Sequence, residues 1–599
     1  MQLNKLTRFP LILGVMILAA TFCRAEDPDW RTPYELSGGR TTPRYDATIN
    51  YCQRLAAASE QLLYTTFGRS PRGRDLPLLI LDGHGNFTPA AVRDSDNVVL
   101  LVQAGIHPGE ICGKDAGLML LRDLTVNGKF PGLLDHVTVL FIPIFSVDGH
   151  ERFGPYNRVN QNGPEEMGWR VTAQNLNLNR DFLKADTPEM QCWLRFFNAW
   201  LPDFFIDIHS TDGADYQYAI SYAMEVHGNM DAGVTDWVRD TYLPQVGDAM
   251  LASGFPLTPY VTFRRWHDPT SGLRSWVASP RLSEGYTALH NRPGLLIETH
   301  MMKPYPVRVD ATYEMVRHTL ELLNRQHHEL RERIETADHA AAVGDLLQEP
   351  LPVRFEFDPT DSVMIDFLGV EFEKLASDLT GGNWFRYGTE PVTYRIPHFN
   401  QQRSTLSLDL PEAYLIPAEW AEVADRLVLH GVAIRRLTEP VTLPIRTYRF
   451  TGSSWQAEPY EGRHPATFQT ERMTEEREFP AGSYLVDMRQ RAARVAAHVL
   501  EPEAPDSYVY WGFFDAVFTR AEYVESYVIE EMARRMIADD PTLLEELEAA
   551  KAADPEFAAD PWAIRYWFYA KTPYYDQRVN IYPVGLIDDR VVLDSLPLN

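Results

Sequence analysis

The chain has 599 residues, of which 45% are hydrophobic and 23% charged, and its formal net charge is −27. This is the composition of a globular protein, and the length exceeds what one hydrophobic core usually organises, so we expect two or more domains. The strong negative charge disfavours nucleic acid and anionic lipid surfaces as partners.

The first 25 residues have the layout of an export signal. A basic start with Lys5 and Arg8 precedes an apolar run from Phe9 to Phe22 and a small-residue exit at Ala25. The run is about 14 residues long and a membrane span needs roughly 20, which favours cleavage over the alternative of a retained anchor. We therefore expect a periplasmic or extracellular protein without a membrane span, beginning with a short extension over residues 26–44.

From about residue 45 to residue 340, helical and strand patterns alternate. The segments whose apolar spacing predicts helices are 48–63, 109–124, 186–200 and 310–342. The apolar runs that predict buried strands are 75–82, 97–105, 136–149, 203–210 and 292–300. Buried strands between helices predict an α/β domain over residues 45–340, with a mixed, mostly parallel sheet flanked by helices.

The pattern changes after residue 350. Short β-rich segments separated by turn residues predict a β-rich domain over residues 350–500. These segments are 351–358, 391–399, 441–450 and 482–488. Residues 501–599 combine helical segments with an aromatic-rich run, which predicts a mixed, mainly α-helical C-terminal region. A scaffold or a lid for a cleft in the first domain is our interpretation of this half of the chain.

Three of the expected strands end in residues that bind metals or transfer protons. His107 and Glu110 follow the strand at 97–105, and His209 ends the strand at 203–210. Ligands of open α/β sheets bind beyond the carboxyl ends of the strands. Two imidazoles and one carboxylate are a ligand set of catalytic zinc, which leaves a position for water.

A fourth residue, Glu298, ends the strand at 292–300 and could accept a proton from that water. Each part alone has a simpler explanation, because the chain holds 17 histidines and Glu110 also suits the first turn of a helix. The coincidence of three strand ends favours a metal site.

In their order along the chain, these residues resemble the zinc carboxypeptidases of the carboxypeptidase A type, over about residues 45–330. The shared order is His-x-x-Glu, an arginine, an Asn-Arg pair, a second histidine, a tyrosine and a glutamate. The matching positions here are His107, Glu110, Arg170, Asn179, Arg180, His209, Tyr286 and Glu298.

The resemblance implies a role for each of these residues. His107, Glu110 and His209 are implied to bind one zinc ion per chain, with Glu298 as the general base. Arg170 is implied to stabilise the oxyanion. Asn179, Arg180 and Tyr286 are implied to bind the substrate.

Some positions depart from the family or allow a second interpretation. Asn177 stands where the family commonly has an aspartate behind the first zinc histidine. Tyr286 is nearer to Glu298 than the family spacing, and a packed loop tyrosine is the alternative. Arg180 could instead pair with the adjacent Asp181.

The sequence therefore predicts an exported zinc metallocarboxypeptidase that hydrolyses peptide bonds at free C-termini of peptides or proteins. A zinc amidase or endopeptidase acting on peptidoglycan stem peptides is one alternative. A non-catalytic relative that binds peptides or glycans is another.

Overall fold

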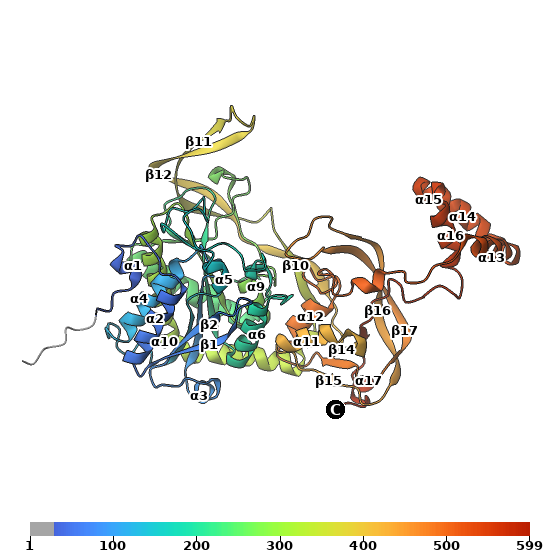
Figure 1. Cartoon of the computed structure of the whole chain (residues 1–599), viewed down its shortest axis with the longest axis horizontal. Helices are drawn as coiled ribbons and strands as arrows, with labels where there is room; N and C mark the ends of the chain where they lie inside the picture. Colours follow the sequence, from blue (N-terminus) through green and yellow to red (C-terminus); the bar gives the residue numbers. More distant parts are fainter. Residues whose placement is uncertain (1–28) are drawn as a thin grey trace, which may run out of the picture.

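The computed structural model of the protein describes residues 29–599, and the expected export signal at residues 1–25 lies outside them. Figure 1 shows an α/β region that continues into a β-rich region, with a group of helices projecting beyond it. No helix within residues 29–599 is long and apolar enough to cross a membrane.

The first region is built on an eight-stranded sheet. Across the sheet its strands are β1 (Leu62–Arg69), β2 (Asp75–Leu81), β4 (Val137–Ile142), β3 (Val98–Ala104), β5 (Phe204–Thr211), β9 (Gly294–His300), β6 (Ile220–Ala223) and β7 (Leu257–Pro259). The central strands β4, β3, β5 and β9 are parallel, and antiparallel pairs flank them. Every residue of these four strands is buried, as expected for a parallel sheet covered on both faces. The mixed, mostly parallel sheet predicted from the sequence is confirmed.

Helices cover both faces of this sheet. Those that share a hydrophobic core with one face are α2 (Tyr45–Ala58), α4 (Cys112–Leu124), α7 (Ala232–Trp237), α8 (Leu243–Ala252) and the long α10 (Tyr305–Val343). Those on the opposite face are α6 (Pro188–Trp200) and α9 (Ser283–Leu289). Short helices lie in the connections: α1 (Pro33–Leu36), α3 (Pro89–Arg93) and α5 (Val147–His150). The start of α4 lies so close to β5 that a Cβ at Gly113 would stand 2.8 Å from Ile208, so only glycine fits there.

The second region shares a hydrophobic core with the first. Phe197 of α6 belongs to the same cluster as Leu427 of α11 (Ala421–Leu429) and Val495 of α12 (Ala493–Leu500). A continuous core ties the two regions together more firmly than a flexible linker.

A six-stranded sheet organises this second region. Across the sheet its strands are β15 (Arg435–Arg436), β18 (Tyr484–Asp487), β14 (Ala413–Ile416), β19 (Gly585–Ile587), β16 (Val441–Trp455) and β17 (Ala466–Phe479). β19 comes from the last residues of the chain and is followed by α17 (Arg590–Asp594). Because β19 lies between β14 and β16, the boundary predicted at residue 500 cuts through one sheet and does not separate two folding units.

Two β-ribbons join this sheet to the first region. β10 (Leu351–Phe357) pairs with β13 (Gln402–Leu408), and β11 (Val363–Ala376) pairs with β12 (Asn383–Phe399) in the long hairpin at the top of Figure 1. The end of β12 pairs in parallel with β8 (Leu273–Arg274) of the first region. The ribbons therefore reach the loop that precedes α9.

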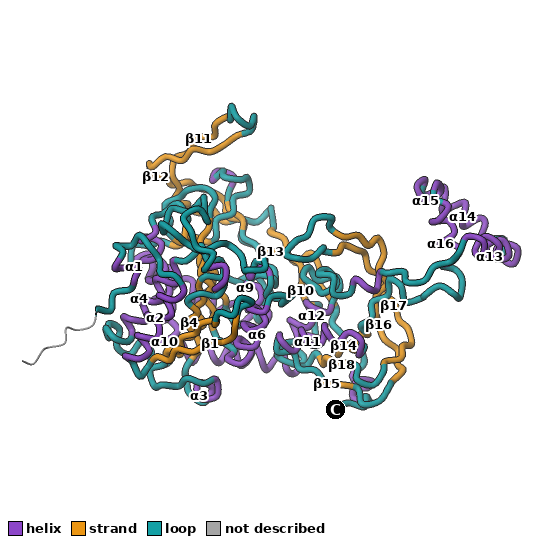
Figure 2. The backbone as a smooth tube through the Cα atoms, in the orientation of Figure 1, coloured by secondary structure: helices purple, strands orange, loops and turns teal. Residues whose placement is uncertain are grey.

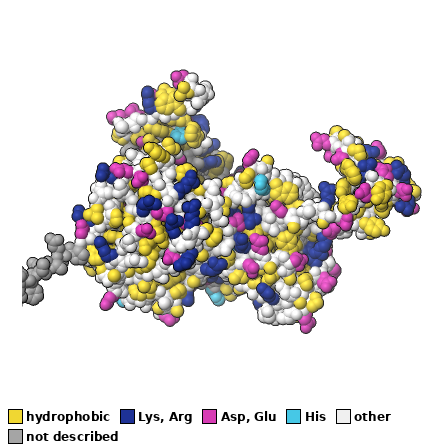
Figure 3. Space-filling model, in the orientation of Figure 1, with side chains coloured by type: hydrophobic (Ala, Val, Ile, Leu, Met, Phe, Trp, Pro, Cys, Tyr) yellow, Lys and Arg dark blue, Asp and Glu magenta, His cyan; other side chains and the backbone are white. Residues whose placement is uncertain are grey.

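The projecting helices form a small cluster of their own, seen to the right in Figure 2. They are α13 (Ser526–Asp539), α14 (Thr542–Ala553), α15 (Pro555–Ala559) and α16 (Pro561–Tyr569), and they pack around Ile529, Leu547 and Phe568. In Figure 3 their surface mixes acidic, basic and apolar side chains.

Candidate active site

The ends of three neighbouring strands bring the candidate residues to one edge of the sheet. β3, β5 and β9 are adjacent and parallel, and His209 of β5 stands beside Glu298 of β9 in register. His107 and Glu110 lie in the turn after β3. A carboxylate oxygen of Glu110 accepts a hydrogen bond from the backbone N–H of Ser210 at 3.1 Å, which fixes this turn against the end of β5.

Two imidazoles and one carboxylate converge at this edge. His107 Nδ1 lies 3.1 Å from Glu110 Oε2, and His209 Nδ1 lies 3.0 Å from the same oxygen. The two Nδ1 atoms are 3.2 Å apart, and all three side chains are buried. Ligand atoms of a tetrahedral zinc lie about 3.3 Å from one another, given metal–ligand distances near 2.0–2.1 Å. The donor set and its spacing therefore fit a zinc ion.

A carboxylate on the same strand holds the ring of His209. His209 Nε2 lies 2.9 Å from Asp207 Oδ2, and Gln103 donates to the other oxygen of Asp207 at 3.0 Å. Burial lowers the pKa of His209, but the negative charge of Asp207 outweighs it and raises the pKa well above its usual value. This contact leaves Nδ1 free to bind a metal. Asp207 was not predicted from the sequence, although strand alternation places residues 207 and 209 on the same face.

A neutral amide holds the ring of His107. His107 Nε2 donates to Asn177 Oδ1 at 2.8 Å, so Nδ1 again faces the cluster. Burial lowers the pKa of His107 to about 4, which keeps its ring uncharged at neutral pH. The amide thus occupies the place behind the histidine where the family commonly has an aspartate.

Two arginines neutralise the second oxygen of Glu110. Glu110 Oε1 accepts from Arg158 Nη2 at 2.7 Å and from Arg170 Nη1 at 3.1 Å. Burial raises the pKa of Glu110, but His107 and Arg158 outweigh it and hold the pKa well below the usual value, so the carboxylate stays ionised. Arg170 is half exposed and lines the cavity, whereas Arg158 is almost buried and was not anticipated from the sequence.

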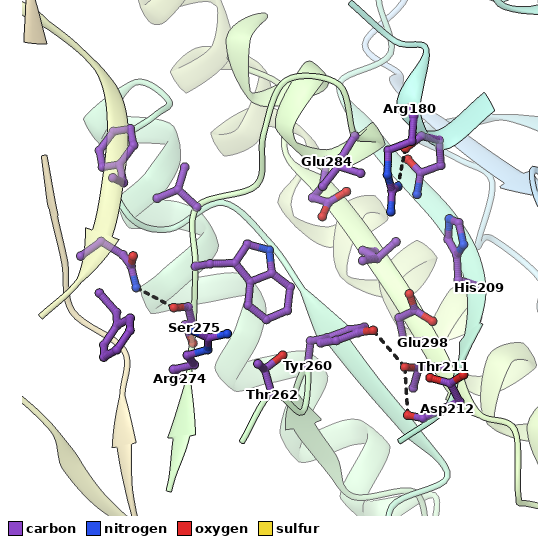
Figure 4. A pocket seen from close by; sticks show the side chains of 18 of the residues that line it. Arg180, His209, Thr211, Asp212, Tyr260, Thr262, Arg274, Ser275, Glu284 and Glu298 are labelled. Carbon is purple, nitrogen blue, oxygen red and sulfur yellow. Dashed lines mark hydrogen bonds between the residues drawn. The ribbon is translucent and has the colours of Figure 1, made fainter. Parts of the chain in front are cut away.

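Glu298 faces the same space with a free carboxylate oxygen. Its Oε2 is buried and has no hydrogen-bond partner within residues 29–599. Burial raises the pKa of Glu298 to about 8, against the opposing effect of His209. Figure 4 shows Glu298 beside His209 with its carboxylate directed into the opening. A carboxylate in this setting is suited to exchange a proton with a bound molecule.

The Asn-Arg pair lies on a short 3-10 turn, Leu178–Arg180, at the side of the cavity. Arg180 Nη1 donates to the carbonyl of Asn179 at 2.6 Å, and its guanidinium points into the opening in Figure 4. Asp181 accepts instead from Lys184 at 2.5 Å and from the Thr187 hydroxyl at 2.7 Å. The alternative pairing of Arg180 with Asp181 is therefore wrong, and Arg180 has no carboxylate partner in the described part of the chain.

Tyr286 does not line the cavity, and the prediction that it contacts substrate is wrong. It is fully buried, and its hydroxyl lies 2.9 Å from His430 Nδ1. The reason is helical phase, because two residues along a helix rotate a side chain by about 200°. Glu284 of α9 lines the cavity, so Tyr286 points the other way, into the core with Trp193.

A different tyrosine lines the cavity. Tyr260, in the loop after β7, extends into the opening in Figure 4, and its hydroxyl lies 2.9 Å from Thr211 Oγ1. The sequence offered no signal for it, since the segment between His209 and Glu298 contains several aromatic residues without a distinguishing pattern.

The cavity has a volume of about 890 Å³ and is closed on one side by the second region. Phe355 and Phe357 of β10 and Gln402 of β13 form this wall, and Gln402 Nε2 donates to the carbonyl of Ser275 at 2.9 Å. Glu284 lies deep in the opening, where burial raises the pKa of its carboxyl.

The family comparison matches part of the first region. Residues 48–231 match the zinc carboxypeptidase family. That match includes His107, Glu110 and His209, and it confirms the family resemblance stated from the sequence.

Individual relatives extend over most of the chain. Carboxypeptidase 2 of Trichophyton rubrum is 26% identical over 492 residues, which cover 80% of this chain and 85% of the relative. Carboxypeptidase 2 of Trichophyton equinum is 25% identical over 517 residues, covering 84% of this chain and 89% of the relative. Among solved structures, a metallo-carboxypeptidase from Pseudomonas aeruginosa aligns at 19% identity and a TM-score of 0.36, over 48% of this chain and 70% of its own.

Proposed function

We propose that the protein removes residues from the free C-termini of peptides, because residues 48–231 match the zinc carboxypeptidase family. One observation carries the proposal. The cluster of His107, Glu110 and His209 opens into the same cavity as Glu298 and Arg180. Within residues 29–599, Glu298 Oε2 has no hydrogen-bond partner and Arg180 has no carboxylate partner. The relatives named carboxypeptidase 2 support the same activity.

In this proposal the three clustered side chains bind one zinc ion per chain. The zinc supplies a Lewis acid that polarises a carbonyl and lowers the pKa of water toward 7. His107 and His209 present Nδ1 because Asn177 and Asp207 occupy their Nε2 atoms. Asp207 also raises the basicity of the ring that it holds.

Glu298 moves the proton. Its carboxylate accepts a proton from water as the water oxygen attacks the scissile carbonyl carbon, and it returns that proton to the amine nitrogen as the C–N bond breaks. Burial raises the pKa of this carboxyl to about 8, near neutral pH, so that it can act as a base and then as an acid.

The arginines hold the two negative charges of the reacting substrate. The planar guanidinium of Arg170, which is charged at all relevant pH values, can donate hydrogen bonds to the oxyanion that develops on the scissile carbonyl. Arg180 can form a bidentate pair with a C-terminal carboxylate, and Asn179 adds a neutral donor beside it. Because Arg180 has no carboxylate partner within residues 29–599, its guanidinium can form this pair.

Export is part of the proposal and rests on the sequence alone. Residues 1–25 have the basic start, apolar run and small-residue exit of a cleaved signal. Sequencing the N-terminus of the protein recovered from its native host would show whether cleavage follows Ala25.

The activity is tested with matched peptides that differ only in a free or an amidated C-terminus. The zinc-loaded protein is expected to shorten the free peptides one residue at a time, as read by mass spectrometry, and to leave the amidated twins intact. Removal of zinc by a chelator should stop the reaction, and added zinc should restore it. Equal cleavage of both twins, or internal cleavage, would replace the carboxypeptidase assignment with an amidase or endopeptidase.

A further inference from the structure

The long hairpin of β16 and β17 ends in a tight turn that reaches the active site. Tyr460 and Arg463 exchange backbone hydrogen bonds of 2.7 and 3.1 Å across this turn. Between them, Glu461 and Gly462 have φ values of +51° and +79°. Two successive left-handed residues in a two-residue loop form a type I′ turn, whose first position favours asparagine, aspartate or glycine.

Glutamate is therefore an unfavourable residue at position 461 of this turn. A left-handed conformation strains a side chain with an ordinary Cβ, and such strain commonly persists where the side chain has a function. The backbone does not explain the choice of glutamate, so its contacts must.

The carboxylate of Glu461 contacts the segment that supports the metal cluster. Glu461 Oε2 accepts a hydrogen bond from the backbone N–H of Asn177 at 2.9 Å. The turn lies directly on this segment, because a Cβ at Gly462 would stand 3.0 Å from Leu176. An ionised acceptor makes a hydrogen bond about twice as strong as a neutral one.

Asn177 in turn orients two parts of the site. Its Oδ1 accepts from His107 Nε2 at 2.8 Å and from the backbone N–H of Asn179 at 2.9 Å. A shift of Asn177 would rotate the ring of His107 and displace the turn that carries Asn179 and Arg180.

The turn is firmly held by other contacts. Arg463 makes two hydrogen bonds of 2.7 Å to the carboxylate of Asp186, and its guanidinium lies 3.9 Å from the ring centre of Phe513. The rings of Tyr460 and Trp511 are stacked at 6.0 Å. Glu461 therefore projects from a rigid support and can fix Asn177 in place.

We propose that Glu461 is a positioning residue of the metal site, through which the second region sets the orientation of His107. The carboxylate fixes the backbone of Asn177, and the amide of Asn177 then fixes the imidazole. The inference rests on the proposed function only in that His107 binds zinc.

The test compares zinc affinity, measured by competition with a chelator, in the full-length parent and in four variants. Glu461→Ala removes the acceptor. Glu461→Gly also removes it but suits the left-handed backbone. Glu461→Gln keeps an oxygen acceptor, and Glu458→Ala removes an exposed glutamate from the same hairpin as a matched control. Melting temperatures of the zinc-free proteins are recorded in parallel.

Glu461→Ala and Glu461→Gly are both expected to bind zinc about 10-fold more weakly than the parent. This is the lower end of the effect of losing a group that contacts a metal ligand directly, because Glu461 acts through Asn177. Glu461→Gln should restore most of the affinity, and Glu458→Ala should match the parent. Zinc affinity equal to that of the parent in both Glu461→Ala and Glu461→Gly would overturn the inference. So would weak zinc binding in Glu461→Ala together with parental zinc affinity in Glu461→Gly, because backbone strain would then be the cause.

Zinc affinity also separates this inference from the proposed function. A parent that binds zinc and trims peptides, with acceptor-free variants that bind zinc equally well, contradicts only the role of Glu461. A parent that binds no zinc contradicts both.

Discussion

The two regions of the molecule contribute to the cavity in different ways. In the first region, His209 and Glu298 sit on neighbouring strands in register, and His107 follows the strand beside them. In the second region, Glu461 and Gln402 reach the site from a hairpin tip and a ribbon. The difference suggests a division of labour, in which sheet register sets the reacting groups and long-range contacts set their orientation and access.

A buried ion pair joins the two regions beside the cavity. Asp506 of the second region is fully buried and lies 2.6 Å from Arg281, in the loop that leads to α9. That loop contributes Trp276 and Leu282 to the cavity lining. The second region is thus well placed to shape the cleft without supplying a metal ligand.

Removing the proton carrier of the first region should have the largest effect. Glu298→Gln keeps all three clustered side chains, so we expect zinc to bind as in the parent while kcat falls by about 10²- to 10⁴-fold. Steady-state kinetics together with metal analysis measure both quantities. Activity near that of the parent would show that another group takes the proton.

Breaking the anchor between the regions should act mainly on stability. Asp506→Ala leaves Arg281 without its carboxylate in a largely buried place, so the free energy of unfolding should fall by about 3 kcal/mol. Denaturant unfolding checks this value. Asp409→Ala, which removes an exposed partner of Arg472, is the control and should change stability by less than about 1 kcal/mol.

Loss of the guanidinium of Arg180 should weaken recognition of the C-terminus. Arg180→Ala is expected to lower kcat/KM for free peptides by about 10- to 100-fold, because a hydrogen-bonded charge pair with the carboxylate is lost. Arg403→Ala, on the wall contributed by the second region, should change the same parameter by only about threefold or less, as for an exposed arginine. If the two variants are equally impaired, both regions bind the carboxylate and the division of labour is wrong.

The smallest effect concerns a buried carboxyl on α6, the helix between the two regions. Burial raises the pKa of Glu189 to about 7, and its oxygens have no partners in the described part of the chain. Since the folded protein then holds a proton that the unfolded chain releases near pH 4.5, Glu189 should lower stability as the pH rises from about 4.5 to about 7.

Glu189→Gln should remove this pH dependence. Relative to the parent, the variant should gain on the order of 2 kcal/mol in unfolding free energy between pH 5 and pH 8. Denaturant unfolding at the two pH values measures the gain. If the unfolding free energies of Glu189→Gln and the parent differ by the same amount at pH 5 and at pH 8, Glu189 does not titrate in this range.

Local patterns in the sequence were enough to predict the sheet and the convergence of its strand ends. Continuous apolar runs mark the buried strands, and parallel strands must place His209 and Glu298 at one edge. The contact of Asp207 with the ring of His209 could also have been predicted, since Asp207 lies two residues earlier on the same strand. The prediction for Tyr286 was wrong because the order of residues along the chain does not show which face of α9 lines the cavity.

Contacts between distant segments could not be predicted in this way. β19 completes a sheet whose other strands end at residue 487, and no local pattern assigns it to that sheet. Glu461 lies 284 positions from Asn177, and neither its left-handed backbone nor its contact with Asn177 can be read from the sequence. The contribution of the second region to the site therefore follows from the folded structure and not from local sequence patterns.

Diffraction at the zinc absorption edge from crystals of the zinc-loaded protein shows whether the three clustered side chains bind zinc. We expect one strong anomalous peak per chain, bounded by His107 Nδ1, Glu110 Oε2 and His209 Nδ1. Absence of a peak there, or a stronger peak at another place, would contradict this expectation.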